Sequence, residues 1–156
     1  MTRARLEAKI GFDKIRETIS NRCQTEYATR RVAEEEFSSD EDKISERLAI
    51  TDEMRLVVMF EDSFPTTGYI DALPFLEPLE KSGSCIDVSS LGKLSTLLEI
   101  SRKLGYFFSS IKDGVYPLLK KRVNKMASFP EIRRRIEAIL DKYGEIKDSA
   151  SPELLH

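Results

Sequence analysis

The stretch of sequence that decides the fold is Val88–Ile111, VSSLGKLSTLLEISRKLGYFFSSI. Its apolar residues recur at steps of mostly three and four, which is the spacing of one face of an α-helix. They are Leu91, Leu94, Leu98, Leu104, Phe108 and Ile111, with Leu97, Ile100 and Phe107 beside them. A stripe of this width can pack against two neighbours, so the segment predicts the central helix of an all-α core.

Two further helices are predicted near the N-terminus. Apolar residues recur at helical spacing over Ile10–Ile19, and Asp13 is a residue type that can cap a helix beginning near Lys14. Residues 25–37 keep apolar residues on one side and charged residues on the other. A tight break separates the two segments, so we expect a helical hairpin.

A long helix should follow, ending near Glu61. Ser38 and Ser39, followed by the acidic pair Glu41 and Asp42, form a capping arrangement in which hydroxyls accept amide protons and carboxylates favour the positive end of the helix dipole. Beyond it, residues 71–79 contain two prolines, which lack backbone donors. That segment predicts a short, irregular helix.

The remaining helices follow the central one. Asp113-Gly114 should end it, Val115–Met126 should form another helix, and Pro130 suits the first turn of a helix reaching about Leu140. A short stretch of β-structure is expected near Glu145–Lys147. The whole pattern predicts an irregular bundle of about six to seven antiparallel helices joined by short turns.

We expect one domain over residues 1–156, because no flexible linker or internal repeat divides the chain. Ser151-Pro152-Glu153 is a good helix start, yet only Leu154, Leu155 and His156 follow it. A helix that short cannot hold itself together, so the sequence predicts a segment truncated at its C-terminal end.

Composition places the chain among soluble proteins. It has 40% hydrophobic and 33% charged residues, its N-terminus lacks an apolar run typical of a signal peptide, and no stretch approaches about 20 apolar residues. We therefore expect a cytoplasmic protein that does not contact a membrane. Cys23 and Cys85 are expected to be reduced thiols.

The formal charge of −2 conceals two oppositely charged segments. Residues 34–62 hold eleven acidic against three basic residues, whereas residues 112–135 hold eight basic against two acidic ones. The candidate nucleic-acid-binding residues in the second segment are Lys120, Lys121, Arg122, Lys125, Arg133, Arg134 and Arg135. Contacts to phosphates need charge more than geometry. The alternatives are an ordinary polar face or an intramolecular partner for the acidic segment, because no aromatic residues are interleaved and no groove-reading motif is present.

The sequence gives little support to a phosphate-binding loop, a catalytic triad or a metal site. Gly92-Lys93 continues into Leu94 inside the strongest helical pattern rather than forming a phosphate-binding loop. The single histidine, His156, lacks the companions that a triad or a zinc site needs. The acidic runs at residues 34–36 and 40–42 are typical of solvated helix ends. We expect no catalytic residue, cofactor or metal in this segment.

The tail Asp141–Leu154, DKYGEIKDSASPEL, resembles the signature of bacterial MutS-II proteins, where an Asp-Gly-Glu-Val turn precedes Asp-Ser-Ala-Ser-Pro and a long helix. Ile10–Ile15 resembles the family's opening helix. Gly68–Asp71, with Pro74 and Leu76, resembles its Gly-x-x-Asp-x-x-Pro-x-Leu element, although Pro78 and Leu79 stand where alanine is more usual and Ser90 replaces a common acidic residue. The next helix matches at Leu91, Leu94, Leu98, Arg102, Leu104 and Phe107.

The resemblance implies the N-terminal half of the core and lever region of a MutS relative. In that family, long helices lead on to a clamp, and the chain returns to a Walker-type ATPase and usually ends in an Smr nuclease domain. The parent protein is then expected to be a homodimer that uses ATP and Mg²⁺, binds branched DNA or stalled ribosomes, and suppresses homologous recombination. This segment would be a stiff body that transmits motion. The alternative is a stand-alone helical module that binds nucleic acid or protein.

Overall fold

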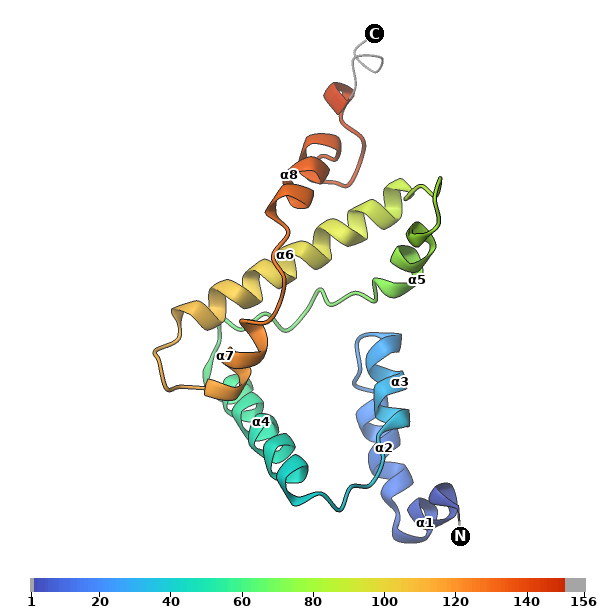
Figure 1. The fold of residues 1–156 in the computed structure, drawn as a ribbon, viewed down its shortest axis with the longest axis vertical. Helices are drawn as coiled ribbons and strands as arrows, with labels where there is room; N and C mark the ends of the chain where they lie inside the picture. Colours follow the sequence, from blue (N-terminus) through green and yellow to red (C-terminus); the bar gives the residue numbers. More distant parts are fainter. Residues whose placement is uncertain (1, 151–156) are drawn as a thin grey trace.

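The computed structural model describes residues 2–150 of the chain. The all-α class is confirmed, because the described residues form eight α-helices, two short 3-10 helices and no strand. Figure 1 shows their arrangement. The α-helices are α1 (Arg3–Ile10), α2 (Phe12–Ser20), α3 (Glu26–Glu34), α4 (Glu41–Phe60), α5 (Leu73–Leu76), α6 (Val88–Ser110), α7 (Pro117–Val123) and α8 (Pro130–Ile139), and the 3-10 helices are η1 (Glu77–Glu80) and η2 (Asp148–Ala150).

The N-terminal end of the chain holds one helix more than the sequence pattern indicates. α1 precedes the predicted hairpin, and Gly11 separates α1 from α2 in the left-handed conformation, with φ of 72°. The prediction that Asp13 caps the second helix is wrong, because α2 begins at Phe12 and Asp13 lies inside its first turn. The hairpin itself is confirmed by the packing of α2 on α3.

The N-cap of the long helix α4 directly follows the two serines predicted to cap it. Its N-cap is Asp40, whose carboxylate accepts a hydrogen bond from the amide of Lys43 at 3.1 Å. The serine prediction is therefore wrong for the cap itself, although the Ser38 hydroxyl accepts a bond from the Asp40 amide. A carboxylate suits this position better than a hydroxyl because it also complements the positive end of the helix dipole.

The hydrophobic core lies where α4, α6 and α7 meet. Val57 is fully buried there, together with Phe107, Phe108 and Tyr116. The rings of Phe107 and Phe108 stand edge to face at 5.0 Å between centroids, and Phe64 packs against Phe107 at 5.3 Å. Edge-to-face pairs of this kind add about 0.5–1.5 kcal/mol beyond the area they bury. The core residues of α6 thus come from the stripe that its sequence shows.

Two carboxylates, one from Glu53 of α4 and one from Glu61 directly after α4, hold the start of α7. Glu53 accepts hydrogen bonds from the amides of Leu118 at 3.1 Å and Leu119 at 2.8 Å, so it serves as an N-terminal cap supplied by another helix. Glu61 accepts a bond from the Tyr116 hydroxyl at 3.1 Å. Tyr116 is left-handed, with φ of 51°, and this unusual backbone turns the chain into Pro117.

The C-terminal part of the described chain packs on α6 through α8, and a tight hairpin turn follows α8. α8 contacts α6, and its last turn leads to an isolated antiparallel bridge between Leu140 and Ile146. Asp141 closes the turn by accepting bonds from the amides of Tyr143 and Glu145 at 2.8 and 2.9 Å. This bridge is the short β-structure that the sequence predicts near Glu145–Lys147.

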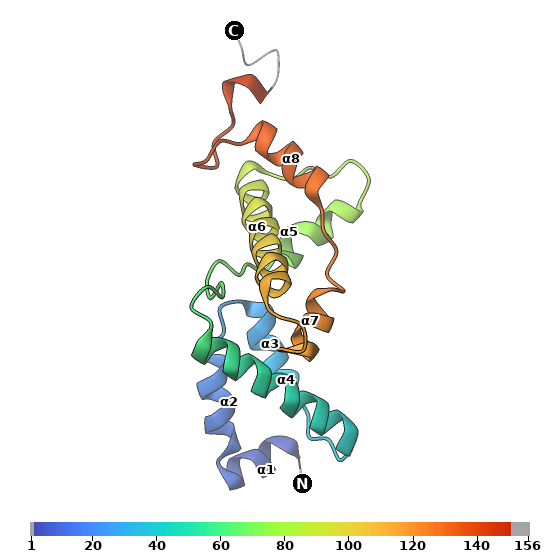
Figure 2. The ribbon, with the colours of Figure 1, turned by 90° about the vertical axis from the view of Figure 1, so that its left-hand side faces the viewer.

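The molecule is open rather than closely packed. It exposes 12102 Å² of accessible surface, whereas a compact monomer of 17.9 kDa exposes roughly 8000 Å². In the two views related by 90°, α1 lies at one end and α8 at the other (Figures 1 and 2). The architecture therefore leaves much apolar surface in contact with solvent.

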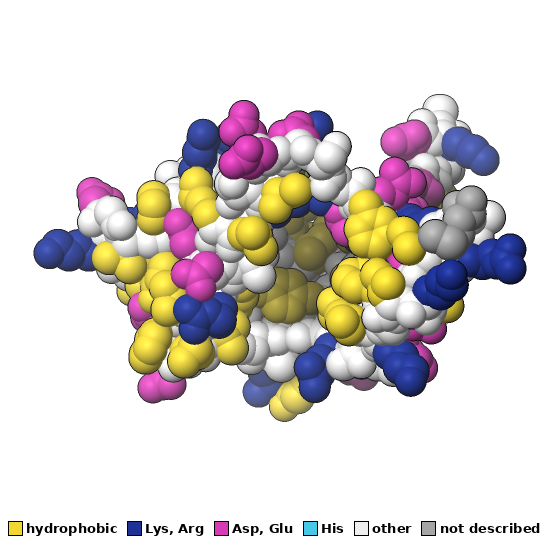
Figure 3. Space-filling model, turned by 90° about the horizontal axis from the view of Figure 1, so that it is seen from below, with side chains coloured by type: hydrophobic (Ala, Val, Ile, Leu, Met, Phe, Trp, Pro, Cys, Tyr) yellow, Lys and Arg dark blue, Asp and Glu magenta, His cyan; other side chains and the backbone are white. Residues whose placement is uncertain are grey.

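The helices α1–α3 stand apart from the core. At one end, Gln24 donates to the carbonyl of Thr66 at 2.7 Å and the Tyr27 amide donates to Asp71 at 3.1 Å; at the other, Glu35 pairs with Arg47 of α4. Figure 3 shows a hollow at this end of the molecule with apolar side chains around it. We call the apolar residues of α4 that turn away from the core its outer face: Ile44, Leu48, Val58 and Met59.

Two predictions cannot be compared with this fold. The expected helix start at Ser151-Pro152-Glu153 and the prediction that His156 belongs to no triad or zinc site both concern positions outside the described residues. The two cysteines are both free thiols, with Cys85 exposed and Cys23 partly buried. None of the described helices has both the length and the apolarity needed to cross a bilayer.

Candidate nucleic-acid interface

The seven candidate residues fall on two neighbouring elements. Lys120, Lys121 and Arg122 lie on α7, Lys125 follows in the turn after it, and residues 133–135 lie on α8. Both elements pack against α6, so the fold places the basic residues on elements that contact the central helix. The seven residues differ in how many hydrogen bonds and ion pairs they form within the protein.

Lys120 has a structural role. Its ammonium group donates to the carbonyl of Ile111, just beyond the end of α6, and to the carboxylate of Asp113 at 3.1 Å. Its side chain is only 16% exposed. A cation at this place satisfies a carbonyl that the helix leaves unpaired and complements the negative end of its dipole. Lys120 therefore has little capacity left for an external phosphate.

The three arginines of α8 are paired with carboxylates of the same helix. Arg133 lies 2.7 Å from Glu137, and Arg134 and Arg135 flank Glu131 at 2.7 and 3.4 Å. The two partners of Glu131 are largely exposed, and exposed pairs of this kind contribute only about 0–1 kcal/mol. A phosphate could therefore compete for these arginines, but they are not free cations.

The least engaged cations are Lys121, Arg122 and Lys125, which we call the α7 basic cluster. All three side chains are exposed, and no ion pair within residues 2–150 includes any of them. Such cations can neutralise phosphates without first losing an internal partner. Of the seven predicted residues, these three fit a nucleic-acid contact best.

The acidic segment does not neutralise these cations in the structure. Glu53 and Glu61 lie beside α7, but they accept hydrogen bonds from its backbone and from Tyr116 rather than from lysine or arginine. Burial, and then the bond to Glu61, raises the pKa of the Tyr116 hydroxyl. Within the described residues, no ion pair joins the α7 basic cluster to residues 34–62.

A pit of about 330 Å³ opens beside the basic residues, and two aromatic rings line it. Tyr106 comes from α6 and Phe129 from the residue before α8, with Arg102 and Arg133 at the same pit. Aromatic residues do not alternate with the basic residues in the sequence. The fold, however, places Tyr106 and Phe129 beside Arg102 and Arg133. One feature of the sequence could have indicated this aromatic surface: Tyr106 is large and aromatic, yet it falls outside the apolar stripe of α6.

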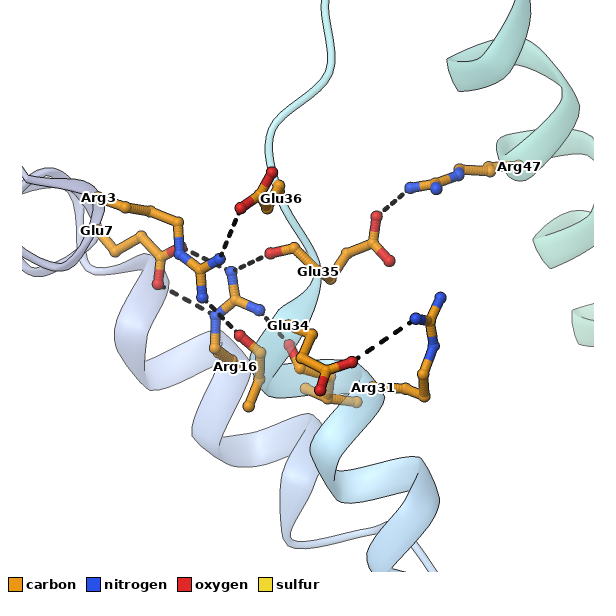
Figure 4. A network of polar contacts seen from close by, with 10 residues as sticks. Arg3, Glu7, Arg16, Arg31, Glu34, Glu35, Glu36 and Arg47 are labelled. Carbon is orange, nitrogen blue, oxygen red and sulfur yellow. Dashed lines mark hydrogen bonds and ion pairs between the residues drawn. The ribbon is translucent and has the colours of Figure 1, made fainter.

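A second polar cluster joins the N-terminal helices (Figure 4). The buried carboxylate of Glu7 accepts two bonds from Arg16, at 2.6 and 3.1 Å, and Arg3 lies 3.3 Å from it. Arg16 also donates to the carbonyls of Val32 and Glu35 at the end of α3. The bonds from Arg16 lower the pKa of Glu7, and those to Glu7 raise the pKa of Arg16. The partners are all internal, so the cluster fastens α1, α2 and α3 together.

Gly92-Lys93 cannot form a phosphate-binding loop in this fold. Both residues lie inside α6, where the backbone amides are used by the helix itself. Among residues 2–150, no group of three or more histidine, cysteine, aspartate or glutamate side chains is placed to hold a metal ion. The described geometry therefore offers a charged and aromatic surface as its candidate site.

Comparison with known proteins finds similarity to bacterial MutS2 proteins. The chain is 28% identical over 145 residues to Endonuclease MutS2 of Thermomicrobium roseum, 26% over 149 residues to that of Leuconostoc citreum, and 25% over 145 residues to Putative endonuclease MutS2 of Bacillus subtilis. These matches cover 92%, 93% and 92% of the chain. No family model matches it.

The chain spans 18% of the length of each of these relatives. The similarity extends over nearly the whole chain, which confirms the resemblance to the MutS-II family that the residues indicate. The name of the relatives is consistent with an endonuclease family.

Proposed function

We propose that this chain is a non-catalytic helical framework within a MutS2-like protein. The parent protein would be a homodimer that binds branched DNA or stalled ribosomes, hydrolyses ATP with Mg²⁺ and suppresses recombination. This segment would couple the nucleotide-driven motion to the grip on the target. Packed helices can transmit such motion because their interfaces have discrete arrangements rather than a continuous range.

The observation that carries this proposal is the large apolar surface that the helices leave exposed to solvent. The accessible surface exceeds that of a compact monomer by roughly 4000 Å². Leu48 and Met59 of the α4 outer face are 65% and 59% exposed, although the opposite face of the same helix forms the core. A helix with apolar residues on two sides is typical of one that has neighbours on both.

The experiment tests the role of the α4 outer face in the complete gene product. Leu48→Glu places a charge on that face without touching the core, and we expect DNA to lose its effect on the rate of ATP hydrolysis. The matched control is Ser45→Glu, which adds the same charge to an exposed position of α4 that carries no apolar side chain. Equal behaviour of the two variants, or a reading frame without a Walker motif, would contradict the proposal.

A second function is favoured by one specific observation: the three cations of the α7 basic cluster form no ion pair with any other described residue. In this alternative the segment itself touches nucleic acid through phosphates. Each phosphate neutralised contributes about −0.9 to the slope of log affinity against log salt, so three contacts predict a slope of roughly −3. A slope near zero for branched DNA would exclude direct phosphate contacts.

The variant for this test replaces Lys121, Arg122 and Lys125 with alanine. It should reduce both the affinity and the salt slope. Replacing Lys9, Lys14 and Arg22 with alanine removes the same total charge from exposed positions of the N-terminal helices and turn. If this control lowers the slope as much as the first variant does, general charge rather than the α7 basic cluster is responsible.

A further inference from the structure

The pit between α6 and the α7–α8 connection is lined by both aromatic and positively charged side chains. One wall comes from α6, with Leu98, Arg102 and Tyr106, and the other from Met126, Phe129 and Arg133. Gly105 lies at the pit, and no heavy atom stands within 4 Å of the place where its side chain would begin. The volume of about 330 Å³ is at the lower end of the range for small-ligand sites.

The two rings at the pit differ from the core aromatics. Tyr106 is 71% exposed and Phe129 is 49% exposed, while the adjacent Phe107 is buried. Neither ring belongs to an aromatic pair within residues 2–150. Both rings therefore keep surface that a partner from outside can contact.

The charge around the pit favours an anionic partner. Arg102 and Arg133 line it directly, and two members of the α7 basic cluster lie nearby in the chain, Arg122 at the end of α7 and Lys125 on the α7–α8 connection. The arginines are bonded to carboxylates of their own helices, at 2.8 Å to Glu99 and 2.7 Å to Glu137. Those pairs hold the guanidinium groups at the edge of the pit, and exposed pairs exchange partners at little cost.

We propose that this pit binds unpaired bases of a single-stranded nucleic acid. The bases stack on Tyr106 and Phe129, and the phosphates that follow them meet the α7 basic cluster. Stacking on aromatic rings beside a positively charged surface is how proteins hold single strands without reading their sequence. This inference rests on the second function proposed above and specifies its substrate. A purely apolar protein segment fits less well, because two arginines line the pit.

The test compares a fluorescent oligothymidylate with a duplex of equal length at fixed salt. Loss of one stacking contact lowers affinity roughly five- to 150-fold, so Tyr106→Ala and Phe129→Ala should each weaken the single strand by a factor in this range. Tyr106→Phe should bind as the wild type does. The matched control is Tyr143→Ala, which removes another exposed tyrosine, 76% exposed and outside the pit.

The salt dependence separates this inference from the function on which it rests. Tyr106→Ala should keep the slope of the wild type, because no phosphate contact is lost, whereas the alanine variant of the α7 basic cluster should reduce it. Equal losses on single strand and duplex, or no loss on either, would overturn the stacking site and leave phosphate binding intact. Failure of the wild-type chain to bind either probe would overturn both.

Discussion

The Nη2 atom of Arg16 lies 2.6 Å from the Oε1 atom of Glu7, and this contact joins α2 back to α1. The carboxylate is buried, and the same guanidinium donates to the carbonyls of Val32 and Glu35 at the end of α3 (Figure 4). One arginine thus fastens three helices, and its orientation depends on the charge of Glu7.

This contact predicts a specific loss of stability in acid. The pKa of folded Glu7 lies below its ordinary value of 4.5, so its stabilising effect is complete above that pH and is lost as the pH falls through the folded value. Urea unfolding of the wild type and of Glu7→Gln should therefore differ most near neutral pH and converge in acid. A constant difference across the whole range would contradict the assignment.

Glu53 should stabilise the protein through α7. Glu53→Ala leaves the amides of Leu118 and Leu119 without their acceptor, so we expect a loss of about 1–2 kcal/mol in the free energy of unfolding. Glu46→Ala, at an exposed position of the same helix, should change it by less than about 0.5 kcal/mol. Equal effects in denaturant titrations would show that Glu53 is not a cap.

The aromatic core should respond strongly to truncation. Phe107 is 4% exposed and touches both Phe64 and Phe108, so Phe107→Ala should cost about 3–5 kcal/mol. Phe60→Ala removes the same side chain from a position that is 67% exposed and should cost little. If Phe107→Ala unfolds the chain, Phe107→Leu should still melt cooperatively at a lower temperature. Equal melting temperatures for the Phe60 and Phe107 variants would contradict this core.

Two glycines should respond in opposite directions to alanine. Gly68 has φ of 89°, and a Cβ atom there would lie 3.0 Å from Cδ1 of Ile100, so Gly68→Ala should destabilise by about 1–2 kcal/mol. Gly105 lies within α6 with open space around it, and Gly105→Ala should stabilise by about 1 kcal/mol. Thermal melts of the two variants check both signs, and a shift in the same direction would contradict them.

Elements with a strong periodic pattern were predictable from the sequence. Val88–Ile111 corresponds to α6 within one residue, and Pro130 begins α8 as its fixed backbone angle favours. The hairpin of α2 and α3 and the bridge near Ile146 also followed from local signals. In these places the residues near in sequence determine the structure.

Features that depend on distant residues were not predictable. α1 has a charged, weakly patterned sequence, and it is held by the bonds of Glu7 to Arg16, nine residues away. Glu53 caps a helix that begins more than sixty residues later. The pit likewise brings Tyr106 and Phe129 together only through the packing of α6 with the elements that follow it.

The candidate site was predictable in type but not in detail. The cluster of positive charge between residues 112 and 135 is visible in the sequence, and the i, i+3 and i, i+4 spacing of Glu131 with Arg134 and Arg135 already indicates pairing along α8. The bond of Lys120 to the carbonyl of Ile111 depends on the turn between α6 and α7. Only the structure separates the engaged cations from the α7 basic cluster.

The central claim is that the chain forms an open helical frame whose apolar faces lack neighbours. Small-angle X-ray scattering of the dilute, monomeric chain tests it most directly. A compact domain of 156 residues has a radius of gyration of about 15 Å, and an unfolded one about 41 Å. We predict a value clearly above the first and far below the second, with helical circular dichroism, whereas a radius of about 15 Å would contradict the open frame.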